Sequence, residues 1–94
     1  MTKDRDHVVV TVVGTDKVGI VAKISGLLAR HDVNIIDISQ TIMGDLFTMI
    51  MLVDLARADL DLDDLSKKLE ALSKRIGVQI IVRHERIFRF MHRI

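Results

Sequence analysis

Residues 14 to 20 read Gly14-Thr15-Asp16-Lys17-Val18-Gly19-Ile20, and the spacing of the apolar residues changes across them. Before this stretch, residues 8 to 13 are a β-branched run, Val-Val-Val-Thr-Val-Val, which favours a strand. After it, Ile20, Ile24 and Leu27 recur at the three-to-four spacing of a helix. A strand-to-helix junction presents free backbone N–H groups and the positive end of the helix dipole. We therefore expect a small-ligand site, if the protein has one, to include this junction.

The first helix is predicted from about Lys17 to His31. Asp16 precedes it as a good N-cap, because a carboxylate there accepts hydrogen bonds from the first-turn N–H groups. Gly19 leaves that turn without a side chain, so another molecule can approach the backbone closely.

Two further strands are predicted to form a hairpin, from Ile35 to Met43 and from Leu46 to Leu55. Gly44 and Asp45 between them suit a type II′ turn, which needs glycine at its first central position. The second of these strands is apolar on both faces and should be central in the sheet. The turn fixes the pairing, which we predict to be Ile42 with Phe47, Ile38 with Met51, Ile36 with Val53, Thr41 with Thr48 and Asp37 with Leu52.

A second helix has start and stop signals in the sequence. Asp61 is its predicted N-cap and Gly77 its C-terminal glycine. Between them, an apolar stripe consists of Leu62, Leu65, Leu69, Leu72 and Ile76. A fourth strand follows at 78–83, and residues 84–94 are predicted as a short amphipathic C-terminal helix with Ile87, Phe88, Met91 and Ile94 on one side.

The order strand, helix, strand, strand, helix, strand predicts an α+β fold, the ferredoxin-like βαββαβ plait. Its four-stranded antiparallel sheet has the order 4-1-3-2, with both helices on one face. The other face carries the aliphatic side chains Val9, Val13, Leu46, Ile50, Leu52 and Ile81. A second subunit or the C-terminal helix should cover them, because so large an apolar patch is unusual on a monomer.

Composition narrows the possible functions. The 94 residues form a single domain, 1–94, with 49% hydrophobic residues and a net charge of +1. The mixed charges argue against nucleic-acid binding, and no apolar run is long enough for a membrane span. Without cysteine or a signal peptide, the chain is expected to be cytoplasmic.

Several chemistries are disfavoured by the residues themselves. The spacing from Gly14 to Gly19 matches half of a phosphate loop, but Ile20 and Val21 stand where that loop needs Lys and Ser or Thr. His84 and His92 lie eight residues apart, which does not suit a metal pair on a helix. We also find no nucleophile and base in register and no cofactor motif, so we predict no enzyme, metal or cofactor.

The junction resembles the start of an ACT domain, the small-molecule sensing module of amino-acid metabolism. The first turn of that family commonly reads Asp or Asn, Arg or Lys, Pro, Gly and then Ile, Val or Leu, similar to residues 16–20 here. Val33-Asn34-Ile35 resembles the family's helix-to-strand signature. The likeness covers nearly the whole chain. It is closest to the stand-alone UPF0237 group and to the ACT modules of the glycine-cleavage repressor and formyltetrahydrofolate deformylase, on the strength of residues 11–22 and 87–94.

The resemblance implies a ligand site shared across a dimer. In serine-sensing ACT domains, two asparagines that hold the amino acid fall on Asp16 and Asn34 here. Asp16 would take the ammonium group, and N–H groups near Gly19 and Ile20 the carboxylate. The implied site comprises Gly14, Thr15, Asp16, Val18, Gly19, Ile20 and Asn34. Val18 replaces a common proline, and Gly14 replaces a ligand-contacting histidine of the serine sensors. The alternative is purely structural: a helix cap, a packing glycine and a turn residue.

The resulting prediction is a non-enzymatic regulatory module that binds an amino acid or a related metabolite at a homodimer interface. The alternative is an adaptor without a ligand, which docks a partner protein through the open sheet face or the C-terminal helix.

Overall fold

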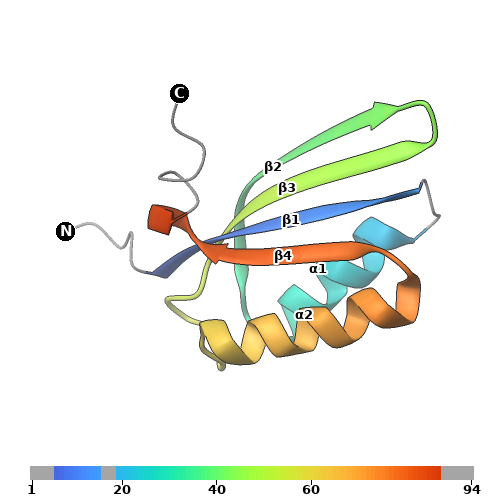
Figure 1. The fold of residues 1–94 in the computed structure, drawn as a ribbon. Coiled ribbons are helices and arrows are strands. Elements are labelled where there is room, and N and C mark those ends of the chain that lie inside the picture. Colours follow the sequence, from blue (N-terminus) through green and yellow to red (C-terminus); the bar gives the residue numbers. More distant parts are fainter. Residues whose placement is uncertain (1–5, 16–18, 88–94) are drawn as a thin grey trace.

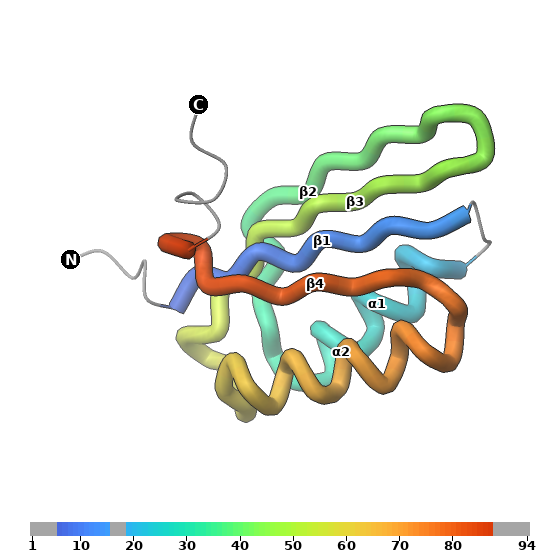
Figure 2. Tube along the Cα trace, viewed as in Figure 1, coloured from blue at the N-terminus to red at the C-terminus, as the bar shows by residue number. Residues whose placement is uncertain are grey.

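The computed structural model describes residues 6–15 and 19–87. Its sheet has four strands, and Figure 1 shows that the helices lie against one face of it. The sheet order is β2-β3-β1-β4, with every neighbouring pair antiparallel. The elements are β1 (His7–Thr15), α1 (Ile20–Arg30), β2 (Asn34–Met43), β3 (Leu46–Asp54), α2 (Leu62–Ile76) and β4 (Gln79–His84). The predicted ferredoxin-like plait and its strand order are confirmed. The trace in Figure 2 follows the same path, and β1 and β3 lie in the centre of the sheet.

The core lies between the sheet and the helices. Alternate side chains of β1 and β3 point into it, as the strand periodicity predicts. Its members are Val8, Val10, Val12, Phe47, Met49, Met51 and Val53 from the sheet, Ile20, Ile24, Leu27 and Leu28 from α1, Val33, and Leu65, Leu69 and Leu72 from α2.

The second helix has the predicted ends. The Asp61 carboxylate accepts a hydrogen bond of 2.9 Å from the Asp64 N–H. At the other end, Gly77 has a φ of +72°, the left-handed conformation in which glycine terminates helices. Neither helix of the described residues is long and apolar enough to cross a membrane.

The first helix begins later than predicted. It starts at Ile20 rather than at Lys17, so the interpretation of Asp16 as its N-cap is wrong. Gly19 occupies the N-cap position with a φ of +91°, and no side chain caps the helix. A left-handed residue cannot be part of a right-handed helix, so Gly19 sets the start. Asp16 and Val18 themselves lie outside the described residues.

The hairpin pairing is right near its turn and wrong at its far end. Gly44 has a φ of +62°, and the four predicted pairs from Ile42–Phe47 to Asp37–Leu52 are confirmed. The predicted pair of Ile36 with Val53 is wrong, because Ile35 lies opposite Val53. The register shifts between residues 35 and 37, as in a β-bulge, which places two residues of one strand against one of its neighbour.

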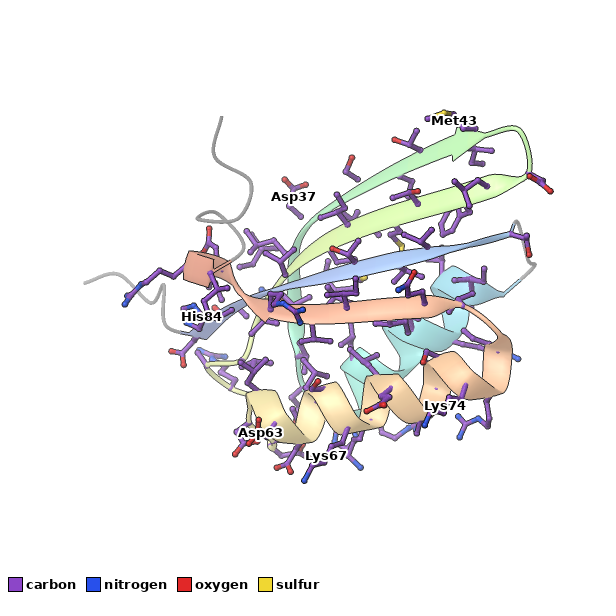
Figure 3. The ribbon with its side chains drawn as sticks, in the orientation of Figure 1. Asp37, Met43, Asp63, Lys67, Lys74 and His84 are labelled. Atoms are coloured by element: carbon purple, nitrogen blue, oxygen red, sulfur yellow. The ribbon has the colours of Figure 1, made fainter. Side chains whose placement is uncertain are left out.

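The edge strand β2 is largely exposed. Ile36, Ile38 and Ile42 are 44%, 39% and 59% exposed, although Ile38 and Ile42 pair with the buried residues Met51 and Phe47 of β3. The reason is visible in Figure 1, where the β2–β3 hairpin extends beyond the two helices. In Figure 3 the labelled Met43 lies near its tip, and this side chain is 70% exposed. The monomer therefore leaves apolar surface along one edge of its sheet.

On the open sheet face, Val9 is buried and Leu46, Ile50 and Ile81 are exposed. Residues 85–87 are helical, which agrees with the start of the predicted C-terminal helix. The rest of that helix, with Phe88, Met91 and Ile94, lies outside the described residues.

Candidate functional site

Two pockets lie at opposite ends of α1. The one at its start has a volume of about 510 Å³ and lies between the helix and the β2–β3 hairpin. It is lined by Gly19, Ile20, Val21, Ala22, Gln40, Ile42 and Phe47. We call it the N-terminal pocket. It contains Gly19 and Ile20, two of the predicted ligand contacts, at the junction that the sequence singled out.

The electrostatics of this pocket favour an anionic group. The N-cap residue Gly19 has no side chain to offer, and the first turn of α1 contains no acidic residue. The first N–H groups of a helix have no partner within the helix, and the dipole adds positive potential there. A carboxylate placed at this end can therefore accept hydrogen bonds from the backbone.

Gly14 and Thr15 have different positions from the pocket residues. Gly14 packs against Val78, the residue before β4, because a Cβ atom at position 14 would lie 2.8 Å from Val78 Cγ1. Its lack of a side chain is thus explained by packing within the chain. Thr15 is exposed at the end of β1, opposite Leu46. Neither residue lines the N-terminal pocket.

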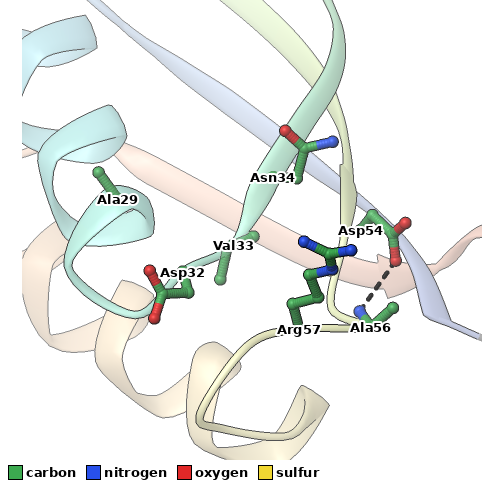
Figure 4. A pocket seen from close by; sticks show the side chains of 7 residues that line it. All are labelled: Ala29, Asp32, Val33, Asn34, Asp54, Ala56 and Arg57. Atoms are coloured by element: carbon green, nitrogen blue, oxygen red, sulfur yellow. Dashed lines mark hydrogen bonds between the residues drawn. The ribbon is translucent and has the colours of Figure 1, made fainter.

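The pocket at the other end of α1 is larger, about 840 Å³, and contains Asn34. Figure 4 shows the side chains that line it, from Ala29, Asp32, Val33, Asn34, Asp54, Ala56 and Arg57. We call it the Asn34 pocket. Asp54 lies directly opposite Asn34 in the pairing of β2 with β3.

The Asn34 pocket combines charges of both signs. The Asp54 carboxylate is held in place, because its Oδ1 accepts a hydrogen bond of 2.9 Å from the Ala56 N–H. Its Oδ2 lies 3.9 Å from His7 Nε2. Arg57 forms no ion pair within the described part of the chain, and Figure 4 shows its guanidinium extending between Asn34 and Asp54. Carboxylate, guanidinium and amide together can bind a polar or charged group of a ligand.

Sequence reasoning missed Asp54 and Arg57. Without the bulge, the pairing predicted from the hairpin turn would place Asn34 opposite Leu55. The bulge shifts the register by one residue and brings Asp54 there instead. The bulge could not be recognised in the sequence, although Asp54 and Arg57 are charged residues at the end of an apolar strand and shortly after it.

The two predicted halves of the ligand site do not meet in one chain. Gly19 and Ile20 line one pocket and Asn34 the other. Between them stands α1, whose 11 residues span about 16 Å at the usual helical rise. A small molecule in one pocket does not reach the other.

Two histidines contact carboxylates that are distant in the chain. His31 Nδ1 lies 2.9 Å from Asp59 Oδ1, and His7 Nδ1 lies 3.0 Å from the buried Glu85 Oε1. Among residues 6–15 and 19–87, no group of three or more His, Cys, Asp or Glu residues is arranged to hold a metal ion. His92 lies outside this range.

Comparison with known proteins identifies the family. The ACT domain model matches residues 6–83. A UPF0237 protein of Methanococcus maripaludis is 56% identical over 89 residues, which is 95% of this chain and 99% of that protein. The chain therefore belongs to the ACT domain family and, within it, to the UPF0237 group. ACT domains are in general regulatory modules that bind small molecules, often amino acids.

Solved structures agree with this assignment. An ACT domain protein from Streptococcus pneumoniae has 39% identity and a TM-score of 0.76, covering 87% of this chain and 92% of its own. A glycine cleavage system transcriptional repressor has 27% identity and a TM-score of 0.73, over 82% of this chain and 44% of its own. A formyltetrahydrofolate deformylase from Burkholderia mallei shares the fold, with 22% identity, a TM-score of 0.74 and coverage of 84% and 28%. The predicted likeness to these proteins is confirmed.

Proposed function

We propose that this chain is a non-enzymatic regulatory module that binds an amino acid or a related metabolite at the interface of a homodimer. The observation that carries the proposal is the placement of the two pockets. Both lie beside the exposed edge strand β2, one at each end of it: Asn34 begins the strand, and Gln40 and Ile42 near its end line the N-terminal pocket. Each pocket alone offers only part of what an amino acid requires.

A two-fold pairing of β2 edges would complete both sites at once. Two identical strands related by a two-fold axis run antiparallel, so the start of one lies beside the end of the other. The Asn34 pocket of one subunit would then face the N-terminal pocket of its partner. Ile38, Ile42 and Met43 would be buried in the same step, which accounts for their exposure in the monomer.

The chemistry of a bound amino acid follows from this arrangement. Its α-carboxylate would accept hydrogen bonds from the first turn of α1, and Asp16 would bind its ammonium group. The partner's Asn34 would close the site from the other side. Arg57 and Asp54 beside Asn34 favour a ligand whose side chain is polar or charged.

We expect Asn34→Ala and Asp16→Ala each to weaken binding of the same amino acid at least about tenfold, or about 1.4 kcal/mol. Each variant removes a polar group that the ligand needs on one side of the shared site. The ligand is first identified by a thermal-shift screen of the twenty amino acids, since a ligand at a hundred times its Kd adds about 2.7 kcal/mol of stability. Isothermal titration calorimetry then measures the affinities.

Two exposed residues that line neither pocket provide matched controls, Asp63→Ala on α2 and Gln79→Ala on β4. They should bind as tightly as the wild type. If the wild type binds none of the amino acids, or if the Asn34 and Asp16 variants bind as tightly as the controls, the sensing function is wrong. An adaptor that docks another protein would then be the better hypothesis.

Assembly has its own prediction. Ile38→Lys should convert the dimer to monomer at micromolar concentration, because it places a charge in the proposed β2 contact. Ile81→Lys is the matched control, with 37% exposure against 39% for Ile38, on the opposite edge strand β4. Analytical ultracentrifugation measures the mass. Dissociation by Ile81→Lys instead would mean that the open sheet face forms the dimer, and a monomeric wild type would contradict both arrangements.

A further inference from the structure

A third cavity lies between the two helices and shares only Ala22 with the pockets described above. It is lined by Ala22, Lys23, Gly26, Leu27, Arg30, Leu72 and Arg75 and has a volume of about 310 Å³. Leu27 and Leu72 are buried core residues and form its floor. Figure 1 shows α1 and α2 side by side below the sheet. We call this cavity the interhelix groove.

The groove concentrates positive charge. Lys23, Arg30 and Arg75 line it, and no carboxylate does. None of these three cations forms an ion pair with any residue in the described ranges. The chain as a whole has a net charge of only +1, so this cluster is a local feature. Figure 3 shows that Asp63 lies at the opposite end of α2 from Lys74. Lys74 is next to Arg75 in the chain, so the Asp63 carboxylate lies away from the arginine that α2 contributes to the groove.

Gly26 keeps the groove open. It lies inside α1, where glycine is a poorer helix former than alanine. Packing within the chain does not require it, because a Cβ atom added there would meet nothing within 4 Å. Any longer side chain at this position would project between the cations. Gly26 thus weakens α1, and its evident effect is to leave the groove accessible.

We propose that the interhelix groove binds a small polyanion with at least two phosphate-type groups. Guanidinium groups donate paired hydrogen bonds to phosphate oxygens, which matches the two arginines. Lys23 and Arg30 are seven residues apart on α1, about 10 Å along the helix, so the positive charge is spread along the groove rather than gathered at one point. A di- or triphosphate has charges distributed over a comparable length. This site is separate from the amino-acid site and does not depend on it.

Tripolyphosphate is the probe, and binding to the full-length protein is followed by two-dimensional NMR and calorimetry. Gly26→Glu should abolish saturable binding, because it places a carboxylate among the cations. Gly26→Gln fills the same space without charge and serves as its matched control, with an intermediate affinity expected. Glutamate and glutamine are both better helix formers than glycine, so both variants should retain the fold. Equal affinities of the glutamate and glutamine variants would overturn the proposal.

A second pair of variants separates the groove from general charge attraction. Arg30→Gln/Arg75→Gln should weaken tripolyphosphate binding at least about tenfold. Lys67→Gln/Lys68→Gln removes the same net charge from exposed positions of α2 and should change the affinity less than about twofold. Equal losses in the two pairs would mean non-specific attraction, and the site would be wrong.

The source of the phosphate groups is distinguished by two further ligands. ATP that binds at least as tightly as tripolyphosphate, with shifts in the Gly26 amide signal, indicates a nucleotide. Weaker binding of ATP than of tripolyphosphate indicates a free polyphosphate. A single-stranded oligonucleotide whose affinity rises with its length, and exceeds that of both, would overturn the small-molecule proposal in favour of a nucleic acid. No saturable binding of tripolyphosphate up to millimolar concentration would also overturn it.

Discussion

Leu69→Ala should lower the free energy of unfolding by about 3 kcal/mol, a large share of the 5–15 kcal/mol typical of a domain. Leu69 has no exposed surface and lies at the centre of the face that α2 turns toward the sheet. Truncation removes the transfer free energy of the lost methyl groups and leaves a cavity that a well-packed core fills only in part. Urea unfolding followed by circular dichroism measures the change, at one fixed protein concentration because assembly adds to stability.

Leu62→Ala is the control on the same helix. Leu62 is only partly buried, at the first position of α2, so its truncation removes less buried surface and leaves a site open to water. We expect it to cost less than half as much as Leu69→Ala. Equal costs for the two variants would contradict the assignment of Leu69 to the centre of the core.

Gly14→Ala should lower the free energy of unfolding by about 2 kcal/mol, as overpacking of a tight contact does. The added Cβ atom would lie 2.8 Å from Cγ1 and 3.2 Å from Cβ of Val78. Val78 precedes β4, so relief of the clash requires the end of β1 and the start of β4 to separate. Urea unfolding again provides the measurement.

Gly26→Ala is the matched control, because it makes the same change where nothing lies within 4 Å. It should raise the free energy of unfolding by about 0.5–1 kcal/mol, since alanine is the better helix former. The double variant Gly14→Ala/Val78→Ala tests the contact itself. Because Val78→Ala removes the Cγ1 atom, Gly14→Ala should lower the free energy of unfolding less in the Val78→Ala background than in the wild type. A double variant whose loss equals the sum of the two single losses would contradict the proposed clash.

Signals close together in the chain predicted most of the fold. Asp61 and Gly77 determine the ends of α2 through contacts within one helical turn, so they could be recognised without the tertiary structure. Gly44 and Asp45 likewise fix the hairpin register through local turn geometry. The predicted register holds from the turn as far as Asp37. The apolar residues of β1 and β3 predicted that these strands are central in the sheet. A central strand has a neighbouring strand along each edge and helices over one face, so its side chains are mostly apolar.

The site depends on features that local signals do not contain. The start of α1 is set by the backbone conformation of Gly19, and a glycine in a sequence can lie inside a helix, as Gly26 does, or before one, as Gly19 does. A bulge shifts the register in β2 and places Asp54, rather than Leu55, opposite Asn34, and the loop after β3 then brings Arg57 beside them. The interhelix groove likewise exists only once two helices separated by a hairpin pack together. Pattern and propensity therefore determined which elements form, whereas the charges that share a pocket were decided by register and packing between residues distant in the chain.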